Sequence, residues 1–286
     1  TGTGKDSGKK VSVAAAIGVG VAVNQAKAGI GAGRRVSTTG NLDIKATTDT
    51  NYATTATGEA VSDDVGVAAA VAMTATFNKT QATIGAGTTV VQAQDINILA
   101  TALQNRDAAF VKTMSAEAVS GASGGEVAVA GALAVVGNDN ETTAAIDEGA
   151  TIGSAASRVG DITVKAEDTS KISAQARAGA LSTGDKSKAG VGASFAVLLS
   201  NNQSLAAIGR DTAAPDAAST IHARSATVKA AKNRVEFYVP NISDVKSFSF
   251  DTLDPSTLPR PNALPTAADA GAGAVPLSCR RGRSRC

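Results

Sequence analysis

Four copies of one pattern run along this 286-residue sequence, and their regular order constrains the fold more than any other feature. Each copy contains an Asn followed six positions later by an Ile: Asn24 with Ile30, Asn78 with Ile84, Asn140 with Ile146, and Asn202 with Ile208. Successive copies are 54, 62 and 62 residues apart. A fixed period of this kind is typical of chains that stack one structural unit on the next. The repeat therefore predicts a stacked architecture.

The stretch before each Asn alternates between two kinds of residue. From Val11 to Val23, every even position holds Ser, Ala or Gly, and every odd position except Ala15 holds Val or Ile. A period of two is typical of a β-strand, and branched side chains fit a pleated surface well. Similar runs at 50–61, 108–119 and 170–181 predict further strands, and no helical pattern is present. The turn-rich segments 62–64, 121–125 and 182–188 are expected as hairpin tips or as corners.

We expect an all-β fold, a parallel β-solenoid of about four 54–62-residue repeats with a mostly disordered C-terminal tail. Strands stacked about 4.8 Å apart pair their backbone groups and enclose a narrow core. A coil of about 20 residues would give each repeat roughly three coils and a rod on the order of 50 Å long. Asn24, Asn78, Asn140 and Asn202 are expected at one corner, where Asn tolerates left-handed geometry and its amide bonds a stacked neighbour. This structural role is favoured over ligand binding, because Asn is common in turns.

Composition excludes several classes of function. Aromatic residues make up 3% of the chain, so few large side chains are available for a wide core. The 27 basic and 25 acidic residues nearly cancel, and no basic stripe with aromatic partners predicts nucleic-acid binding. Catalytic triads and zinc sites need His or Cys side chains, and the chain has one His, His222, and two cysteines, Cys279 and Cys286. These few residues argue against both kinds of site.

Three close pairs of acidic residues are expected at turns: Asp63 with Asp64, Asp139 with Glu141, and Asp147 with Glu148. Solvated turn residues are the ordinary explanation for such pairs. We therefore predict no catalytic residues, no cofactor, no metal site and no enzymatic activity. No run of 18 apolar residues predicts a membrane-spanning segment.

The composition changes near the end of the fourth repeat. Residues 1–234 are expected to form the strand repeats, and 235–250 a possible aromatic end cap containing Phe237, Tyr238, Phe248 and Phe250. A loosely attached strand pair is an equal alternative for that segment. Residues 251–286, which are rich in Pro, Ala, Gly and finally Arg, are expected to be a disordered tail. Because no initiating Met is present, the chain is expected to be a piece of a longer protein.

A family resemblance rests on the segment that follows each Ile. Gly40 to Ala46 reads GNLDIKA, Gln94 to Ala100 reads QDINILA, and Gly160 to Ala166 reads GDITVKA. Together with the preceding apolar strand, this pattern resembles the strand repeats of large secreted bacterial adhesins, of the filamentous-haemagglutinin and autotransporter-passenger type. The resemblance covers residues 11–234; the fourth copy departs from it, with Gly209 followed by Arg and Asp.

The resemblance implies a solenoid outside the cell, secreted or held at the bacterial outer membrane, with no catalytic residues. We expect it to present a face for attachment to host-cell, matrix or neighbouring-cell surface molecules, with flanking repeats of the same chain as neighbours. No membrane insertion of this segment is expected. Two alternatives stay open: a carbohydrate-active solenoid enzyme with its site on the variable loops, and a passive stalk.

Overall fold

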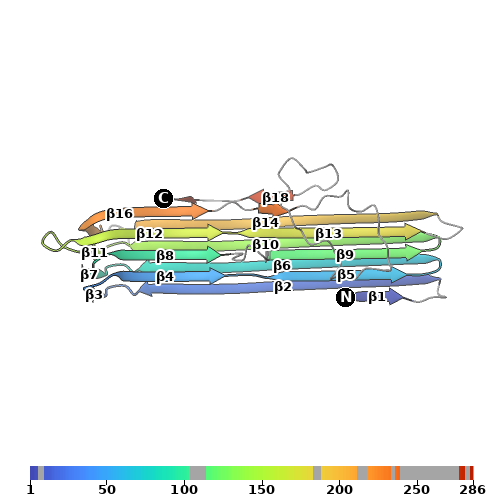
Figure 1. Ribbon diagram of the computed structural model, residues 1–286, viewed down its shortest axis with the longest axis horizontal. Coiled ribbons are helices and arrows are strands. Elements are labelled where there is room, and N and C mark those ends of the chain that lie inside the picture. Colours follow the sequence, from blue (N-terminus) through green and yellow to red (C-terminus); the bar gives the residue numbers. More distant parts are fainter. Residues whose placement is uncertain are drawn as a thin grey trace.

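The chain is all-β, with its strands arranged in parallel sheets, in a computed structural model (Figure 1). The structure describes residues 1–5, 10–103, 114–182, 188–210, 218–232, 236–238, 277–280 and 284–285. Strands make up 81% of it, and the described residues include no helix. The sequence-based expectation of an all-β chain is therefore confirmed for this part of the protein. The arrangement is consistent with a β-solenoid.

One sheet contains the longest strands and is called here the long-strand sheet. It consists of β2 (Val11–Ile30), β6 (Val65–Ile84), β10 (Val127–Asp147) and β14 (Ala189–Arg210). Two short strands, β18 (Leu277–Arg280) and β19 (Ser284–Arg285), pair with the outer edge of β14. A strand of 20 residues spans about 66 Å, so the long axis of the molecule follows the strands (Figure 1).

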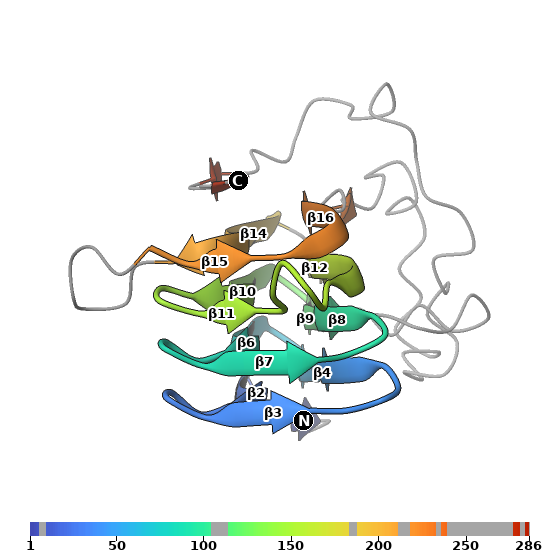
Figure 2. The same ribbon diagram turned by 90° about the vertical axis from the view of Figure 1, so that its left-hand side faces the viewer.

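Three further sheets complete the structure. One contains β4 (Leu42–Asp49), β8 (Ile96–Leu103), β12 (Val159–Thr169) and β16 (Ala223–Lys232). The next contains β1 (Gly2–Lys5), β5 (Ala53–Val61), β9 (Met114–Gly124), β13 (Lys171–Ser182) and β17 (Glu236–Tyr238). These two sheets together form what we call the opposite wall. A short sheet of β3 (Arg35–Ser37), β7 (Thr89–Gln92), β11 (Thr151–Ile152) and β15 (Thr220–Ile221) lies at one end (Figure 2).

The register of the long strands follows the sequence period. Asn24 lies beside Asn78, Asn78 beside Asn140, and Asn140 beside Asn202. Stacked partners are thus 54, 62 and 62 residues apart, so the expectation of a coil of about 20 residues was wrong. That length fits three short sides, whereas here a single strand such as β2 uses 20 residues before the chain turns back. Four layers at about 4.8 Å make a short stack of long strands, not a rod of about 50 Å.

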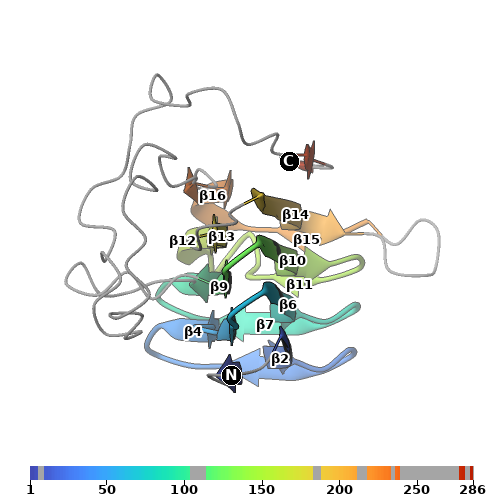
Figure 3. The same cartoon turned by 90° about the vertical axis from the view of Figure 1, so that its right-hand side faces the viewer.

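The core lies between the long-strand sheet and the opposite wall, as the end views show (Figures 2 and 3). It has two parts. The first half of each long strand packs on the β5 sheet through Ala side chains, among them Ala16, Ala70 and Ala132. The second half packs on the β4 sheet and the short end sheet through larger residues such as Ile84 and Ile146. The two parts of the core therefore differ in side-chain size.

The turn after the long strand is made by glycine. Gly33, Gly87 and Gly149 have φ angles of 66°, 65° and 67°, and the three positions are related by the repeat. Glycine adopts this left-handed geometry without the steric cost that a Cβ brings. The segment 62–64 connects β5 to β6, which belong to different sheets, so it is a corner and not a hairpin tip.

Strand pairing continues past residue 234, where the repeats were expected to end. β17, which contains Phe237 and Tyr238, extends the β5 sheet beside β13. Phe248 and Phe250 lie outside the described residues, so this structure does not test the proposed end cap at them. Within the expected tail, the described segments β18 and β19 are strands paired with β14, and the other residues from 251 onward lie outside the described part.

Candidate functional site

The outward side of the long-strand sheet carries a continuous apolar surface, which we call the outer apolar face. It consists of the odd-numbered residues of 11–21, 65–75, 127–137 and 189–199, which lie in register across β2, β6, β10 and β14. All of them are Val, Ile, Leu, Met, Phe, Ala or Gly. Four adjacent strands thus present six consecutive rows without one polar side chain.

The bulky residues of these rows point to solvent. Ile17 is 76% exposed and Phe195 is 68% exposed, whereas Ala70 and Ala72 on the other side of β6 are buried. Of the large and small residues that alternate in the sequence, the large ones therefore face solvent and the small ones face the core. The two walls approach closely here: a Cβ added to Gly192 would lie 2.8 Å from the carbonyl oxygen of Ala178. Close approach of this kind favours Gly and Ala on the inward side, although Val136 and Leu198 are also buried there.

The size of the outer apolar face is unusual for a soluble surface. Six rows of four strands cover about 36 Å by about 19 Å, or about 700 Å². The largest apolar patch on a typical monomeric protein is about 300–600 Å², and larger patches mark interaction sites. The face is therefore a candidate binding surface.

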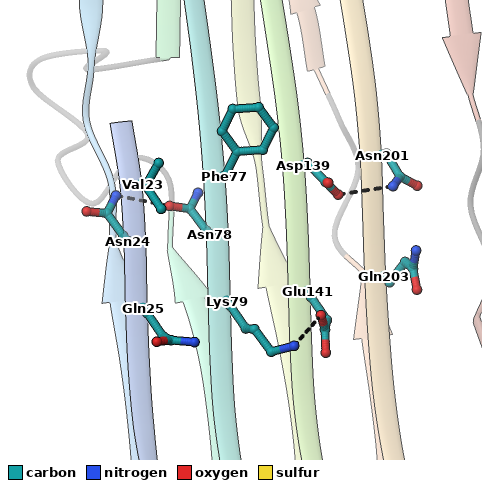
Figure 4. A pocket seen from close by; sticks show the side chains of 10 residues that line it. All are labelled: Val23, Asn24, Gln25, Phe77, Asn78, Lys79, Asp139, Glu141, Asn201 and Gln203. Atoms are coloured by element: carbon teal, nitrogen blue, oxygen red, sulfur yellow. Dashed lines mark hydrogen bonds and ion pairs between the residues drawn. The ribbon is translucent and has the colours of Figure 1, made fainter. Parts of the chain in front are cut away.

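Polar side chains begin in the next two rows and surround an open hollow of about 390 Å³ (Figure 4). In the first of these rows, Asn201 donates a hydrogen bond of 3.0 Å to Asp139. In the second, Lys79 Nζ lies 2.9 Å from Glu141 Oε2. Phe77, which is 49% exposed, lies in the first of these rows beside Asp139.

The hollow corrects one expectation about acidic residues. Asp139 and Glu141 were expected in a turn, but both lie within β10 and point outward. Alternation along a strand places residues i and i+2 on one side, so the pair was a strand signal. Asp63 and Asp64 lie in the corner between β5 and β6. Only two carboxylates line the hollow, and each bonds a neighbour, so the arrangement does not favour acid–base catalysis.

The four Asn residues expected at a corner lie inside the long strands instead. Asn24 Nδ2 donates to Asn78 Oδ1 at 3.0 Å, and Asn78 Nδ2 donates to Asn140 Oδ1 at 2.7 Å. Asn140 and Asn202 are joined through Ser170, to whose Oγ both donate, at 2.9 and 2.7 Å. The amides thus form a ladder along the stack, whereas glycine takes the left-handed corner positions.

This ladder lies where the opposite wall passes from one sheet to the next. Thr50 comes between β4 and β5, and its Oγ1 donates to Asn78 at 3.0 Å. Ser170 holds the equivalent place between β12 and β13. Buried polar groups need partners, and here each wall supplies them to the other. The ladder therefore fixes the long strand against the junction in the opposite wall; nothing in it points to a ligand.

The outer surface of the opposite wall is polar. Asn97 donates to Asp43 at 2.7 Å, and Arg224 donates to both carboxylate oxygens of Asp161 at 2.9 and 2.6 Å. The Arg224 hydrogen bonds, followed by that from Ser225, lower the pKa of Asp161 to about 2. Charged ladders of this kind keep a sheet surface soluble. Among the described residues, the continuous apolar surface therefore lies on the long-strand sheet and not on the opposite wall.

Other kinds of site were sought in the part of the chain that the structure describes. It contains no group of three or more His, Cys, Asp or Glu residues placed to hold a metal ion. Nor does it contain a helix long and apolar enough to cross a membrane. His222 lies between β15 and β16 and donates its backbone N–H to Ile152. Comparison of the chain with models of protein families, with curated proteins and with solved structures finds no match.

Sequence reasoning did not predict the outer apolar face. The alternation of large and small residues was visible, but not which kind faces solvent. One available signal was the change at Val23, after which Gln25 and Lys27 take the odd positions. Residues two apart lie on the same side of a strand. The polar residues near the end of this strand therefore indicate which side faces water along the rest of it.

Proposed function

We propose that this chain is a structural and adhesive segment of an exported bacterial cell-surface protein, working outside the cell without catalysis. Its four repeats would each form one coil of a parallel β-solenoid, and flanking repeats of the same chain would stack on β2, the last strand at the other end of its sheet. The in-register pairing at the sequence period supports the stacking. The resemblance of the strand repeats to secreted adhesins supports the location.

The observation that carries the proposal is the outer apolar face. A surface of about 700 Å² without a polar side chain is costly to leave in water, at roughly 25 cal/mol for each Å². Rigid strands hold it flat, so it can engage a partner with little ordering on binding. Attachment to a host-cell, matrix or neighbouring-cell surface molecule is the function that such a face supports best.

The test is binding of the whole 286-residue chain to cultured cells and to matrix-coated surfaces. We expect saturable binding that is lost in Met73→Glu, which places a charge within the outer apolar face. The matched control is Thr47→Glu, because Thr47 is an exposed strand residue on the opposite wall. Absence of binding by a correctly folded chain, both to these surfaces and to an immobilised copy of itself, would contradict adhesion and favour the passive stalk.

A further inference from the structure

The outer apolar face has no partner among the described residues of its own chain. We propose that a second copy of this chain covers it, so that two long-strand sheets pack face to face as a symmetric dimer. This inference rests on the proposed function and names the partner of the attachment surface, which is the same surface on a second copy of the chain. Three properties of the face point to a second copy.

The first property is its area. A standard protein interface buries about 800 Å² on each partner, and the six apolar rows provide about 700 Å². The next two rows, which contain Asp139, Asn201, Lys79 and Glu141, add a polar rim, which specific interfaces also have. The face is therefore of the size that a stable dimer needs.

The second property is the match between rows under a two-fold axis. An axis parallel to the strands keeps every row opposite itself and reverses the strand order, so that β2 faces β14 and β6 faces β10. Apolar rows then meet only apolar rows. Ile17 faces Phe195 of the second copy, and Val71 faces Leu133 of the second copy. The row of Ala15, Ala69, Gly131 and Ala193 meets its own small side chains.

The third property is charge. Lys79 and Glu141 share a row on the neighbouring strands β6 and β10. The same axis places Lys79 opposite Glu141 of the second copy, and Glu141 opposite Lys79 of the second copy. The four groups then alternate in sign. Such complementarity sets the orientation of a complex more than it raises its affinity. The Lys79–Glu141 pair therefore selects this axis over others that also bury the apolar rows.

The edges of the sheet favour a closed dimer over an open chain of copies. End-to-end stacking needs an unpaired strand at both ends of the sheet. Along β14, residues 197–200 and 204–205 already pair with β18 and β19. A two-fold axis pairs the outer apolar face of one copy with the same face of the other. Both faces are then covered, and no third copy can bind there.

The experiment is sedimentation equilibrium of the whole 28.2 kDa chain over a range of concentrations. We expect the mass of two copies. Met73→Glu should weaken association at least tenfold, because a charge would be buried among apolar rows. Thr47→Glu should leave it unchanged. Circular dichroism of each variant shows whether the strands are retained, and the cavity-forming Phe195→Ala gives a second, uncharged test of the same face.

Charge reversal tests the orientation. Lys79→Glu should weaken the dimer, and the double variant Lys79→Glu with Glu141→Lys should restore it, because opposite charges again face each other. A chain that stays monomeric at every concentration overturns the proposal, and so does a dimer that Met73→Glu and Phe195→Ala leave intact. A monomer that binds neutral phosphatidylcholine vesicles would assign the face to a lipid surface instead. A monomer that still binds cells would overturn the dimer and leave the adhesive function standing.

Discussion

The two halves of the long-strand sheet place their bulky residues on opposite sides. In the first half, Val and Ile point to solvent and Ala lies inside, as at Ile17 and Ala16. In the second half, Ile84 and Ile146 are fully buried, and Lys79 and Glu141 lie outside. The side on which the bulky residues lie thus changes along each strand. The difference shows that hydrophobicity alone does not decide which side of a strand faces the core.

The inner surfaces of the opposite wall account for this change. The β5 sheet offers Ala56, Ala116 and Ala174, which allow the walls to approach closely. The β4 sheet offers the larger side chains of Ile98 and Val164 to its part of the core. A narrow gap fills with Ala and Gly, and a wide gap needs Ile. Most branched residues of the first half lie outside this Ala-rich core and form the outer apolar face; Val136 and Leu198 are the inward exceptions.

The largest expected effect is in the wide part of the core. Ile98→Ala removes a fully buried side chain from the central strand β8 and should lower the free energy of unfolding by about 2–5 kcal/mol. Chemical denaturation measures this loss. The matched variant Val129→Ala on the outer apolar face should change stability by only about 0.5 kcal/mol. Equal losses for the two variants would remove the distinction between core and face.

The next effect is in the narrow part of the core. Ala70→Leu adds three carbon atoms at a buried position of the Ala-rich core, so we expect a loss of about 1–3 kcal/mol from overpacking. Its neighbour in β6 gives the control: Val71→Leu enlarges an outward side chain and should be nearly neutral. If Ala70→Leu stabilises the protein, the gap is wider than the buried alanines indicate.

The amide ladder separates the two halves and should have an intermediate effect. Asn78→Ala removes the acceptor of Asn24 and Thr50 and the donor to Asn140. Leaving buried polar groups without partners costs about 1–3 kcal/mol. Gln203→Ala, at an exposed position of β14, is the control. Denaturation of both variants should show a loss for Asn78→Ala alone; a neutral result would mean that the ladder does not fix the junction.

The smallest effect concerns the polar surface of the opposite wall. The pKa of Asp161 is lowered to about 2 in the folded chain. Since the unfolded value is higher, at about 3.9, the carboxylate stabilises the fold above that pH and ceases to do so as pH falls toward 2. Thermal melting between pH 5 and pH 2 should show a small loss that Asp161→Asn abolishes. An unchanged acid profile in Asp161→Asn would contradict the Arg224 contact.

Much of the architecture was predictable from the repeat. The period gave the register, because each Asn lies beside the next Asn, and the alternation gave the strands. The coil length was not predictable, since a sequence period does not say how many sides a coil has. The position of the Asn ladder was also missed: Asn is typical both of corners and of stacked amides, and only the glycines of positive φ show which residue takes the corner. Which side of the strand faces inward depends on the opposite wall, which other segments of the chain form.

The orientation of the first half of the sheet is the central claim, and thiol reactivity tests it most directly. In a chain carrying Cys279→Ser and Cys286→Ser, single cysteines would replace Val129 or Ala130 in β10, and labelling rates would be compared at concentrations where the chain is monomeric. Val129 is 39% exposed and Ala130 is 2% exposed. We predict that Val129→Cys reacts at least tenfold faster than Ala130→Cys, and that both react alike in denaturant. Faster labelling at position 130 in the folded chain would contradict the account.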